Sequence, residues 1–432
     1  MSLYQKVNRV MIDGIEPGET SPTENLSHIH IMGREAIYMQ VQQHMMDTTS
    51  RQALAYIGYP GTGKTALLRQ LPMYVDLAII SVFLPIAELT LENEDALLTR
   101  FVIRTNQVMS QYDYSMSRIP SLSDDEDSPP MRDWLKETYL PEVLHIIRGQ
   151  RRLVWLLDDF DLLLDAIDKN TLPDDFVTFL QELLVAYPPF GIVLTADTDA
   201  ESRLLNLGTF LSTSSIHRLQ SLPQEAGLAM LQDTAPYFSE GDLKKLYQAT
   251  GGHALWLARA ANALDPTATI SEIIDYIYKH STSDIAAIWA RLSPNEQTIL
   301  QAIAERYYQD PLSPVTLADV TQWVINSDAS MDSTDIHSAL RGLEYRELIL
   351  TGENIQIRSE LVRRWLLSNQ PHDATVNKRQ TNEAQPSSIQ LNWRWIAVII
   401  LLIVIILAVA AYLGQPPTLD GSEALPTVTF SS

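Results

Sequence analysis

The chain has 432 residues, of which 46% are hydrophobic, so it is long enough for two to four domains with sizeable cores. It contains no cysteine, which excludes disulfides and thiolate metal sites, and its nine histidines form no metal-binding pattern such as H-E-x-x-H. The formal net charge of −22 argues against broad electrostatic capture of nucleic acid, although a local basic patch is compatible with it.

The N-terminal half of the sequence predicts an irregular arm followed by an α/β domain. Residues 1–25 are rich in turn formers, and the first 20 contain neither an apolar core nor a signal-peptide pattern. Residues 26–221 alternate apolar, strand-like runs with helical segments, which predicts a parallel sheet covered by helices. Strands are expected at 53–57, 77–83, 152–157, 191–195 and 215–219, and helices at 94–110, 131–148 and 174–186.

A phosphate-binding pattern follows the first expected strand. The pattern G-x-x-x-x-G-K-[ST] is matched by Gly58, Tyr59, Pro60, Gly61, Thr62, Gly63, Lys64 and Thr65. A helix is expected to start directly afterwards, at 66–71. Glycines let backbone N–H groups approach phosphates, and the helix N-terminus adds partial positive charge. This context favours a P-loop over a chance glycine-rich turn, with Lys64 reaching the β- and γ-phosphates of ATP and Thr65 holding Mg²⁺ through its hydroxyl.

A second acidic motif ends the strand expected at 152–157. The apolar run is followed by Asp158 and Asp159, which fits a Walker B motif. Asp158 is predicted to position Mg²⁺, and Asp159 to orient the attacking water. The alternative is a buried strand with a polar end, and the upstream P-loop favours Walker B. Asp161 is interpreted as a surface residue or an indirect support of the site.

Over about residues 29–369 the chain resembles AAA+ and STAND-type P-loop ATPases. Beside the two Walker motifs, the segment Ile-Met-Gly-Arg-Glu at 31–35 resembles a short box that lies near the adenine in this group. The strand at 192–197 resembles sensor 1, with Thr195 at its polar position. The resemblance implies a catalytic role for Thr195, nucleotide binding by Arg34, and ATP with Mg²⁺ held between the core and a helical lid.

The lid region carries two weaker resemblances and one departure. Residues 217–226 resemble the entry to the lid, and the turn at 250–254 resembles its Gly-Gly-x-Pro turn, with Ala254 in place of proline. The core departs from the AAA+ pattern as well, because Asp159 stands where glutamate is usual. Aspartate is one methylene shorter, so slow hydrolysis or a mainly nucleotide-switched protein is expected.

The catalytic and sensing arginines are harder to place. Arg203 follows the sensor-1 strand and is a candidate arginine finger, and Arg259 on the lid is a candidate sensor 2. For both, a surface arginine is the favoured interpretation. Arg358 stands where STAND proteins often carry a histidine that senses the nucleotide, so the resemblance assigns it to nucleotide binding.

A helical lid is expected at 222–284 and a winged-helix domain at 285–369. Helices at 294–307, 317–324 and 334–346 precede a hairpin at 348–357. The winged-helix segment holds seven arginines against eleven acidic residues, a net charge of −4. A regulatory or packing role is therefore favoured over reading of a DNA groove, and nucleic acid is not the expected partner.

The C-terminal end predicts a membrane anchor. A polar linker at 370–392 leads to a predicted transmembrane helix at 393–413, and a tail follows at 414–432. Within this helix, residues 395–413 form an uncharged aliphatic run that is long enough to cross a bilayer. Lys378, Arg379 and Arg394 precede the run, so the bulk of the chain is expected in the cytoplasm and the C-terminus outside.

The sequence thus predicts a membrane-anchored ATP-binding protein that acts as a nucleotide-dependent regulatory or signalling switch. ATP, ADP and Mg²⁺ are its expected ligands, and hydrolysis of the phosphoanhydride is expected to be slow. A nucleotide-dependent homo-oligomer or a protein partner is expected too. The alternative is an ATP-dependent DNA-binding protein of the origin-recognition or transcription-regulatory kind, whose winged helix contacts DNA.

Overall fold

The computed structural model describes residues 32–47, 49–89, 91–119, 129–147, 151–309, 314–326 and 331–369. Within those ranges no helix combines the length and the apolar character that crossing a bilayer requires. The expected arm at 1–25, linker at 370–392, membrane span at 393–413 and tail at 414–432 lie outside the described residues, as does Ile31 of the adenine-side box. These expectations stay predictions.

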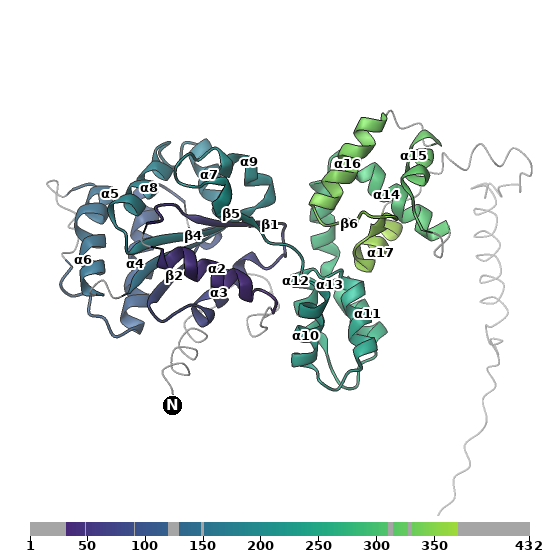
Figure 1. Ribbon diagram of the computed structural model, residues 1–432, viewed down its shortest axis with the longest axis horizontal. Coiled ribbons are helices and arrows are strands. Elements are labelled where there is room, and N and C mark those ends of the chain that lie inside the picture. The colour runs from purple at the N-terminus through teal and green to yellow at the C-terminus, as the bar shows by residue number, and fades with distance from the viewer. Residues whose placement is uncertain are drawn as a thin grey trace, which may run out of the picture. The chain divides into compact units, whose positions relative to one another are not determined.

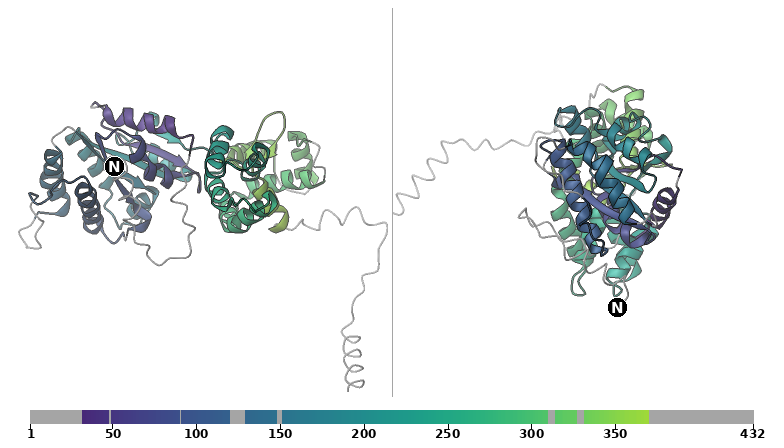
Figure 2. Two further views of the ribbon diagram at one scale, coloured as in Figure 1. Left: turned by 90° about the horizontal axis from the view of Figure 1, so that it is seen from below. Right: turned by 90° about the vertical axis from the view of Figure 1, so that its left-hand side faces the viewer.

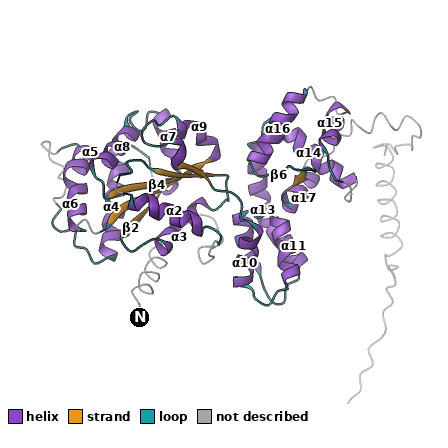
Figure 3. Cartoon of the chain, in the orientation of Figure 1, coloured by secondary structure: helices purple, strands orange, loops and turns teal. Residues whose placement is uncertain are grey.

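A five-stranded parallel sheet forms the centre of the α/β core, in the order β2-β3-β4-β1-β5 (Figures 1 and 3). Apolar runs buried on both faces are typical of parallel strands. Each strand begins and ends within two residues of the predicted bounds, which confirms the α/β fold class: β1 Leu54–Gly58, β2 Ile79–Pro85, β3 Arg152–Asp158, β4 Phe190–Asp197 and β5 Ile216–Arg218.

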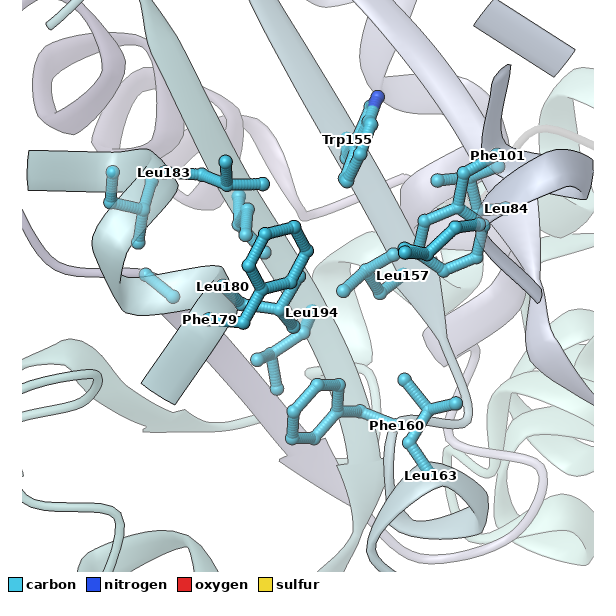
Figure 4. Close-up of a cluster of buried hydrophobic side chains, with 14 of the residues drawn as sticks. Leu84, Phe101, Trp155, Leu157, Phe160, Leu163, Phe179, Leu180, Leu183 and Leu194 are labelled. Atoms are coloured by element: carbon cyan, nitrogen blue, oxygen red, sulfur yellow. The ribbon is translucent and has the colours of Figure 1, made fainter. Parts of the chain in front are cut away.

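Alternate residues of the central strands pack on opposite faces of this sheet. On β3, Leu153, Trp155 and Leu157 belong to the hydrophobic cluster of one face, whereas Val154 and Leu156 belong to that of the other. Figure 4 shows part of the first cluster, in which side chains from three strands meet those of the covering helices. Helices therefore cover both faces of the sheet, as Figure 2 shows.

The core helices agree with the sequence pattern in part. The expected helices at 94–110 and 174–186 are present, but the one at 131–148 is interrupted by a π-helical turn at Leu135–Tyr139. Pro141 follows that turn, and a proline has no N–H to bond four residues back, so the helix widens there. The core helices are α2 Glu35–Met46, α3 Lys64–Tyr74, α4 Glu94–Gln111, α5 Met131–Trp134, α6 Leu140–Ile146, α7 Asp161–Asp168, α8 Phe176–Ala186 and α9 Glu201–Leu205.

Residues 222–369 form a second, largely helical part, called here the lid–winged-helix body. The predicted hairpin is present as β6 Ile349–Leu350 and β7 Gln356–Ile357, which pair antiparallel. The last helix follows it and was not expected. The helices are α10 Gln224–Thr234, α11 Glu240–Thr250, α12 Ala254–Ala263, α13 Ile270–Ala290, α14 Pro294–Gln309, α15 Leu317–Asn326, α16 Ser333–Tyr345 and α17 Glu360–Asn369.

One hydrophobic cluster runs through the whole of the lid–winged-helix body. It joins residues of the expected lid, such as Leu257 and Ile277, to residues of the expected winged helix, such as Leu343 and Trp365. Helix α13 is continuous for 21 residues across position 284, where the sequence analysis puts the junction between the two. Lid and winged helix therefore share one hydrophobic core.

Trp155 is the side chain whose loss should damage the α/β core most. It is fully buried, its Nε1 donates to Thr105 Oγ1 at 3.2 Å, and its ring meets Phe101 and Phe190 edge to face. Because a buried aromatic leaves both a cavity and lost contacts, Trp155→Ala should lower the free energy of unfolding by about 3–5 kcal/mol. Urea-induced unfolding measures this. Met39→Ala, at a side chain 60% exposed, should change it by less than about 0.5 kcal/mol, and equal losses in the two variants would contradict the assignment.

Candidate functional site

The segment between β1 and α3 has the shape of a phosphate cradle. Gly61 and Gly63 have φ of 78° and 94°, a left-handed region that side chains disfavour. Gly63 is the N-cap of α3, and no side chain caps this helix, so first-turn N–H groups are left for a ligand. The N–H and hydroxyl of Thr62 both donate to the carbonyl of Tyr59 and hold the turn. The residues present therefore fit the phosphates of a nucleotide.

Lys64 lies on this loop among acidic side chains. Its Nζ donates to the carbonyl oxygens of Gly58 at 2.7 Å and Tyr59 at 3.3 Å. Burial lowers the pKa of Lys64, and nearby carboxylates oppose this, with Asp197 exerting the largest effect and Asp159 the next. The ammonium group is thus held at the loop by backbone carbonyls and faces more than one negative charge.

Three predicted residues come together at the ends of β3 and β4. Asp158 is buried, and the hydroxyl of Thr195 donates to its Oδ1 at 2.5 Å. The same hydroxyl accepts the N–H of Asp159 at 3.3 Å. Thr195 therefore contacts both Walker B residues, the carboxylate of Asp158 and the backbone of Asp159.

Asp159 has an unusual backbone and an unusual carboxyl group. Its φ is 56°, a left-handed conformation that turns the chain sharply after β3. Burial, together with the negative charges of Asp158 and Asp161, raises the pKa of Asp159 to about 6. A carboxyl group with a pKa near neutrality can hold and accept a proton of a bound water.

A divalent cation here would depend on few protein ligands. Among the described residues, no group of three or more His, Asp and Glu side chains lies close enough to hold a metal ion. The predicted ligands are Thr65, on the first turn of α3, and Asp158. A magnesium ion that keeps several waters and binds the phosphates suits such a sparse set.

Arg34 and Arg358, which the resemblance assigned to nucleotide binding, are held by the protein itself. The Arg34 guanidinium is buried and donates to the carbonyls of Thr62 and Gln220, so it joins the P-loop to the segment that leads into the lid. Burial lowers the pKa of Arg34 to about 10. Arg358 donates to the carbonyl of Gly251 at 2.9 Å, in the lid turn. Their roles toward a nucleotide stay predictions.

The candidate arginine finger and the candidate sensor 2 each form ion pairs with carboxylates of the protein itself. Arg203 forms ion pairs with Asp165 at 2.7 Å and Asp168 at 2.8 Å, both on α7. Arg259 donates to Ser281 and to Asp284 on α13. Both arginines thus pair with a neighbouring helix of their own part of the chain. The Arg203 side chain is 35% exposed and that of Arg259 only 13%, and their roles toward a nucleotide stay predictions.

The structure adds residues of the lid turn that sequence reasoning missed. His253 bonds through Nε2 to the carbonyl of Pro60 at 3.0 Å, and its ring stacks on Trp256 with centroids 4.0 Å apart. The N–H of Leu255 donates to the carbonyl of Gly61 at 2.9 Å. Since Gly61 faces the histidine ring, a Cβ there would lie 2.3 Å from it. The only sequence signal was the position of His253 inside the turn at 250–254.

The winged helix contributes a second set of contacts to the same loop. Arg346, directly after α16, donates to the hydroxyl of Tyr59 and to Asp199 at 3.2 Å. Arg291, directly after α13, pairs with Asp197 at 2.6 Å. These partners lie 94 or more residues apart in the chain, so no local pattern indicates them.

Comparison with known proteins supports the fold. No protein-family model matches the sequence, and no curated protein does. A Walker-type ATPase of Pyrococcus abyssi matches with a TM-score of 0.53 and 14% identity, over 78% of this chain and 96% of its own. The Aeropyrum pernix ORC2 protein, solved as ADPNP–ADP complexes, matches with a TM-score of 0.50 and 16% identity, over 83% and 98%. Identities this low show a shared α/β ATPase fold and no more.

His253 should make the protein sensitive to acid. Burial lowers the pKa of His253 to about 4, so the folded chain resists a proton that the unfolded chain accepts below about pH 6.5. Stability is therefore lost as the pH falls from about 6.5 toward 4. Urea unfolding at pH 7 and at pH 4.5 measures this loss. Between the two pH values, the free energy of unfolding of His253→Phe should fall by on the order of 1–2 kcal/mol less than that of wild type. In the control His337→Phe, at an exposed position, the free energy of unfolding should fall as much as in wild type. An equal fall in wild type and both variants would contradict the assignment.

Proposed function

We propose that the protein binds ATP with Mg²⁺ at Gly58–Thr65 and acts as a nucleotide-dependent regulatory switch with slow hydrolysis. The observation that carries this proposal is the position of Tyr59. It is part of the P-loop, it packs in the hydrophobic cluster of the lid–winged-helix body, and its hydroxyl accepts a hydrogen bond from Arg346. Its carbonyl also accepts from Lys64. One residue therefore contacts both the phosphate-binding lysine and the winged helix.

Each residue of the site has a role in this proposal. The backbone from Gly61 to Lys64 binds phosphate, and Lys64 leaves the carbonyls of Gly58 and Tyr59 to do so. Thr65 and Asp158 hold the magnesium ion, which supplies positive charge to the phosphates. Asp159 holds the attacking water and accepts its proton.

Coupling to the rest of the chain follows from these contacts. When Lys64 leaves Tyr59, the loop that carries the tyrosine changes its hydrogen bonds, and with it the contacts to Arg346 and His253. The lid–winged-helix body shares one core, so it responds as a unit. A changed orientation of this body would alter self-association or the contact with a protein partner. With the predicted span at 393–413, this would take place at the cytoplasmic face of a membrane.

Nucleotide binding is tested by removing the lysine. Lys64→Ala should weaken binding of ADP and of a non-hydrolysable ATP analogue, each with Mg²⁺, by about 10-fold or more, because it removes a charge-assisted contact to phosphate. Isothermal titration calorimetry on the full chain measures this. Lys244→Ala is the matched control, since that lysine is exposed and pairs with Glu240 on the surface of α11.

Phosphate release should then be lost in Asp159→Asn while nucleotide binding is kept. Wild type that binds neither nucleotide would overturn the proposal.

DNA binding is the second candidate function, because helices α14, α15 and α16 and the β6–β7 hairpin follow one another as in a winged helix, with α17 after them. The C-terminal end of α16 is engaged with the core through Tyr345 and Arg346, whereas His337 and Arg341 on its outer face are exposed. With a net charge of −4 over 285–369, we expect no duplex binding tighter than about 10 μM at physiological salt. Fluorescence anisotropy with labelled duplex DNA at several salt concentrations checks this. Tight, salt-dependent binding would favour the DNA-binding function instead.

A further inference from the structure

Asp197 occupies a special place beside the P-loop. It is the last residue of β4, and its Cα is the register partner of Gly58, the first residue of the loop. Among the carboxylates near Lys64, it is the one that raises the pKa of that lysine most. Lys64 itself donates a hydrogen bond to the carbonyl of Gly58. Its own N–H donates to Asp161 at 3.2 Å, which holds the end of the strand in place. The Asp197 carboxylate therefore lies at the phosphate-binding side of the sheet.

Arg291 brings a positive charge to this carboxylate from the lid–winged-helix body. It is the C-cap residue of α13, and its Nη1 lies 2.6 Å from Asp197 Oδ2. The side chain of Asp197 is only 14% exposed and that of Arg291 43%, so the carboxylate is enclosed while the guanidinium stays accessible. The charges of Asp199 and Tyr59 also act to raise the pKa of Arg291.

Arg291 is held less firmly than the other arginines near the loop. In the described part of the chain, Asp197 is the one side chain that accepts a hydrogen bond from Arg291. Arg346 donates to Tyr59, Asp199 and Glu296, and Arg34 is buried between two backbone carbonyls. Of these three cations, Arg291 is the one that can change partner with the smallest loss of hydrogen bonds.

The charges around the loop favour such a change. Asp158, Asp159, Asp161 and Asp197 all act on Lys64, so a bound polyphosphate adds negative charge to a region that is already acidic. A guanidinium between a carboxylate and a phosphate is drawn to the site with more charge and more acceptor oxygens. ADP ends one phosphate earlier than ATP, so the two nucleotides differ at this position.

We propose that Arg291 distinguishes ATP from ADP by exchanging its ion pair with Asp197 for the terminal phosphate of ATP. This rests on the proposed nucleotide binding and deepens it. Asp197 holds Arg291 when no terminal phosphate is present, so it competes with ATP and not with ADP. Arg291 contacts the nucleotide itself in this proposal, and the exchange moves the end of α13 and, through the shared core, the lid and winged helix with it.

The test compares two variants that should shift the preference in opposite directions. Affinities for ADP and for a non-hydrolysable ATP analogue are measured by calorimetry on the full chain with Mg²⁺. Arg291→Gln should weaken analogue binding by about 10-fold and leave ADP binding within about 2-fold, because a charge-assisted bond to the terminal phosphate is lost. Asp197→Asn should strengthen analogue binding by about 3- to 10-fold relative to ADP, since the competing carboxylate is gone.

Matched controls make the outcome decisive. Arg364→Gln removes an arginine of the same body that pairs with Asp275 at the surface, and it should alter neither affinity. Arg291→Lys keeps the charge and should restore part of the preference for the analogue. A misfolded Asp197→Asn cannot bind more tightly, so a gain in affinity is not an artefact of folding.

Two results would overturn the proposal, and they differ from failure of nucleotide binding as such. If Arg291→Gln changes both affinities equally or neither, or if Asp197→Asn lowers the preference for the analogue, Arg291 does not read the terminal phosphate, although the protein binds nucleotide. If wild type binds neither nucleotide, or if Lys64→Ala binds both as well as wild type does, the proposed function falls and this inference falls with it.

Discussion

The burial of Tyr59 is the interaction on which the rest of the structure depends. A P-loop must leave its backbone exposed to phosphate, yet this side chain is only 6% exposed and packs in the core of the lid–winged-helix body. The other buried members of that cluster, among the described residues, all come from Leu222 onward. The loop is therefore anchored to the helical body by an apolar ring, and its hydroxyl is bound by Arg346. Separating the two parts would expose both the ring and the arginine.

Around this anchor the site is unusually acidic. Carboxylates at the ends of β3 and β4 surround Lys64, and one of them, Asp197, pairs with Arg291 of the lid–winged-helix body. Arg346 of the same body pairs with the nearby Asp199, so the two arginines oppose part of this negative charge while they bind the two parts together. An arrangement of this kind makes the contact between the parts depend on the charge in the nucleotide site, since every added or removed charge alters the balance.

Local patterns in the sequence predicted the local structure well. The strands, the P-loop and the pair Asp158 and Asp159 were predicted because apolar runs, glycines and turn residues act over a few neighbours. The sequence analysis gave no bounds for the short helix α7, whose eight residues directly follow the Walker B acids. The expected boundary between lid and winged helix, at 284, falls inside α13. This helix begins at the capping box formed by Thr269 and Glu272 and continues without interruption to its C-cap, Arg291.

The contacts that define the site in three dimensions could not be read in the same way. His253 to Pro60, Arg346 to Tyr59 and Arg291 to Asp197 join segments that are far apart in the chain. An arginine has no local sequence signature that names its partner, so the ion pairs of Arg203 with α7 and of Arg259 with α13 were not predicted. Such pairings follow from the arrangement of the two parts, which a single sequence does not encode locally.

Helix α13 has a mechanical consequence. At 1.5 Å per residue, its 21 residues form a rod about 30 Å long, with Arg291 at one end and the start of the helix at Thr269 at the other. A tilt of a few degrees at the P-loop end displaces the far end by an ångström or more. If the proposed coupling holds, it works in both directions, because linkage is reciprocal. A partner that binds along this rod and prefers one tilt would then change which nucleotide the loop retains.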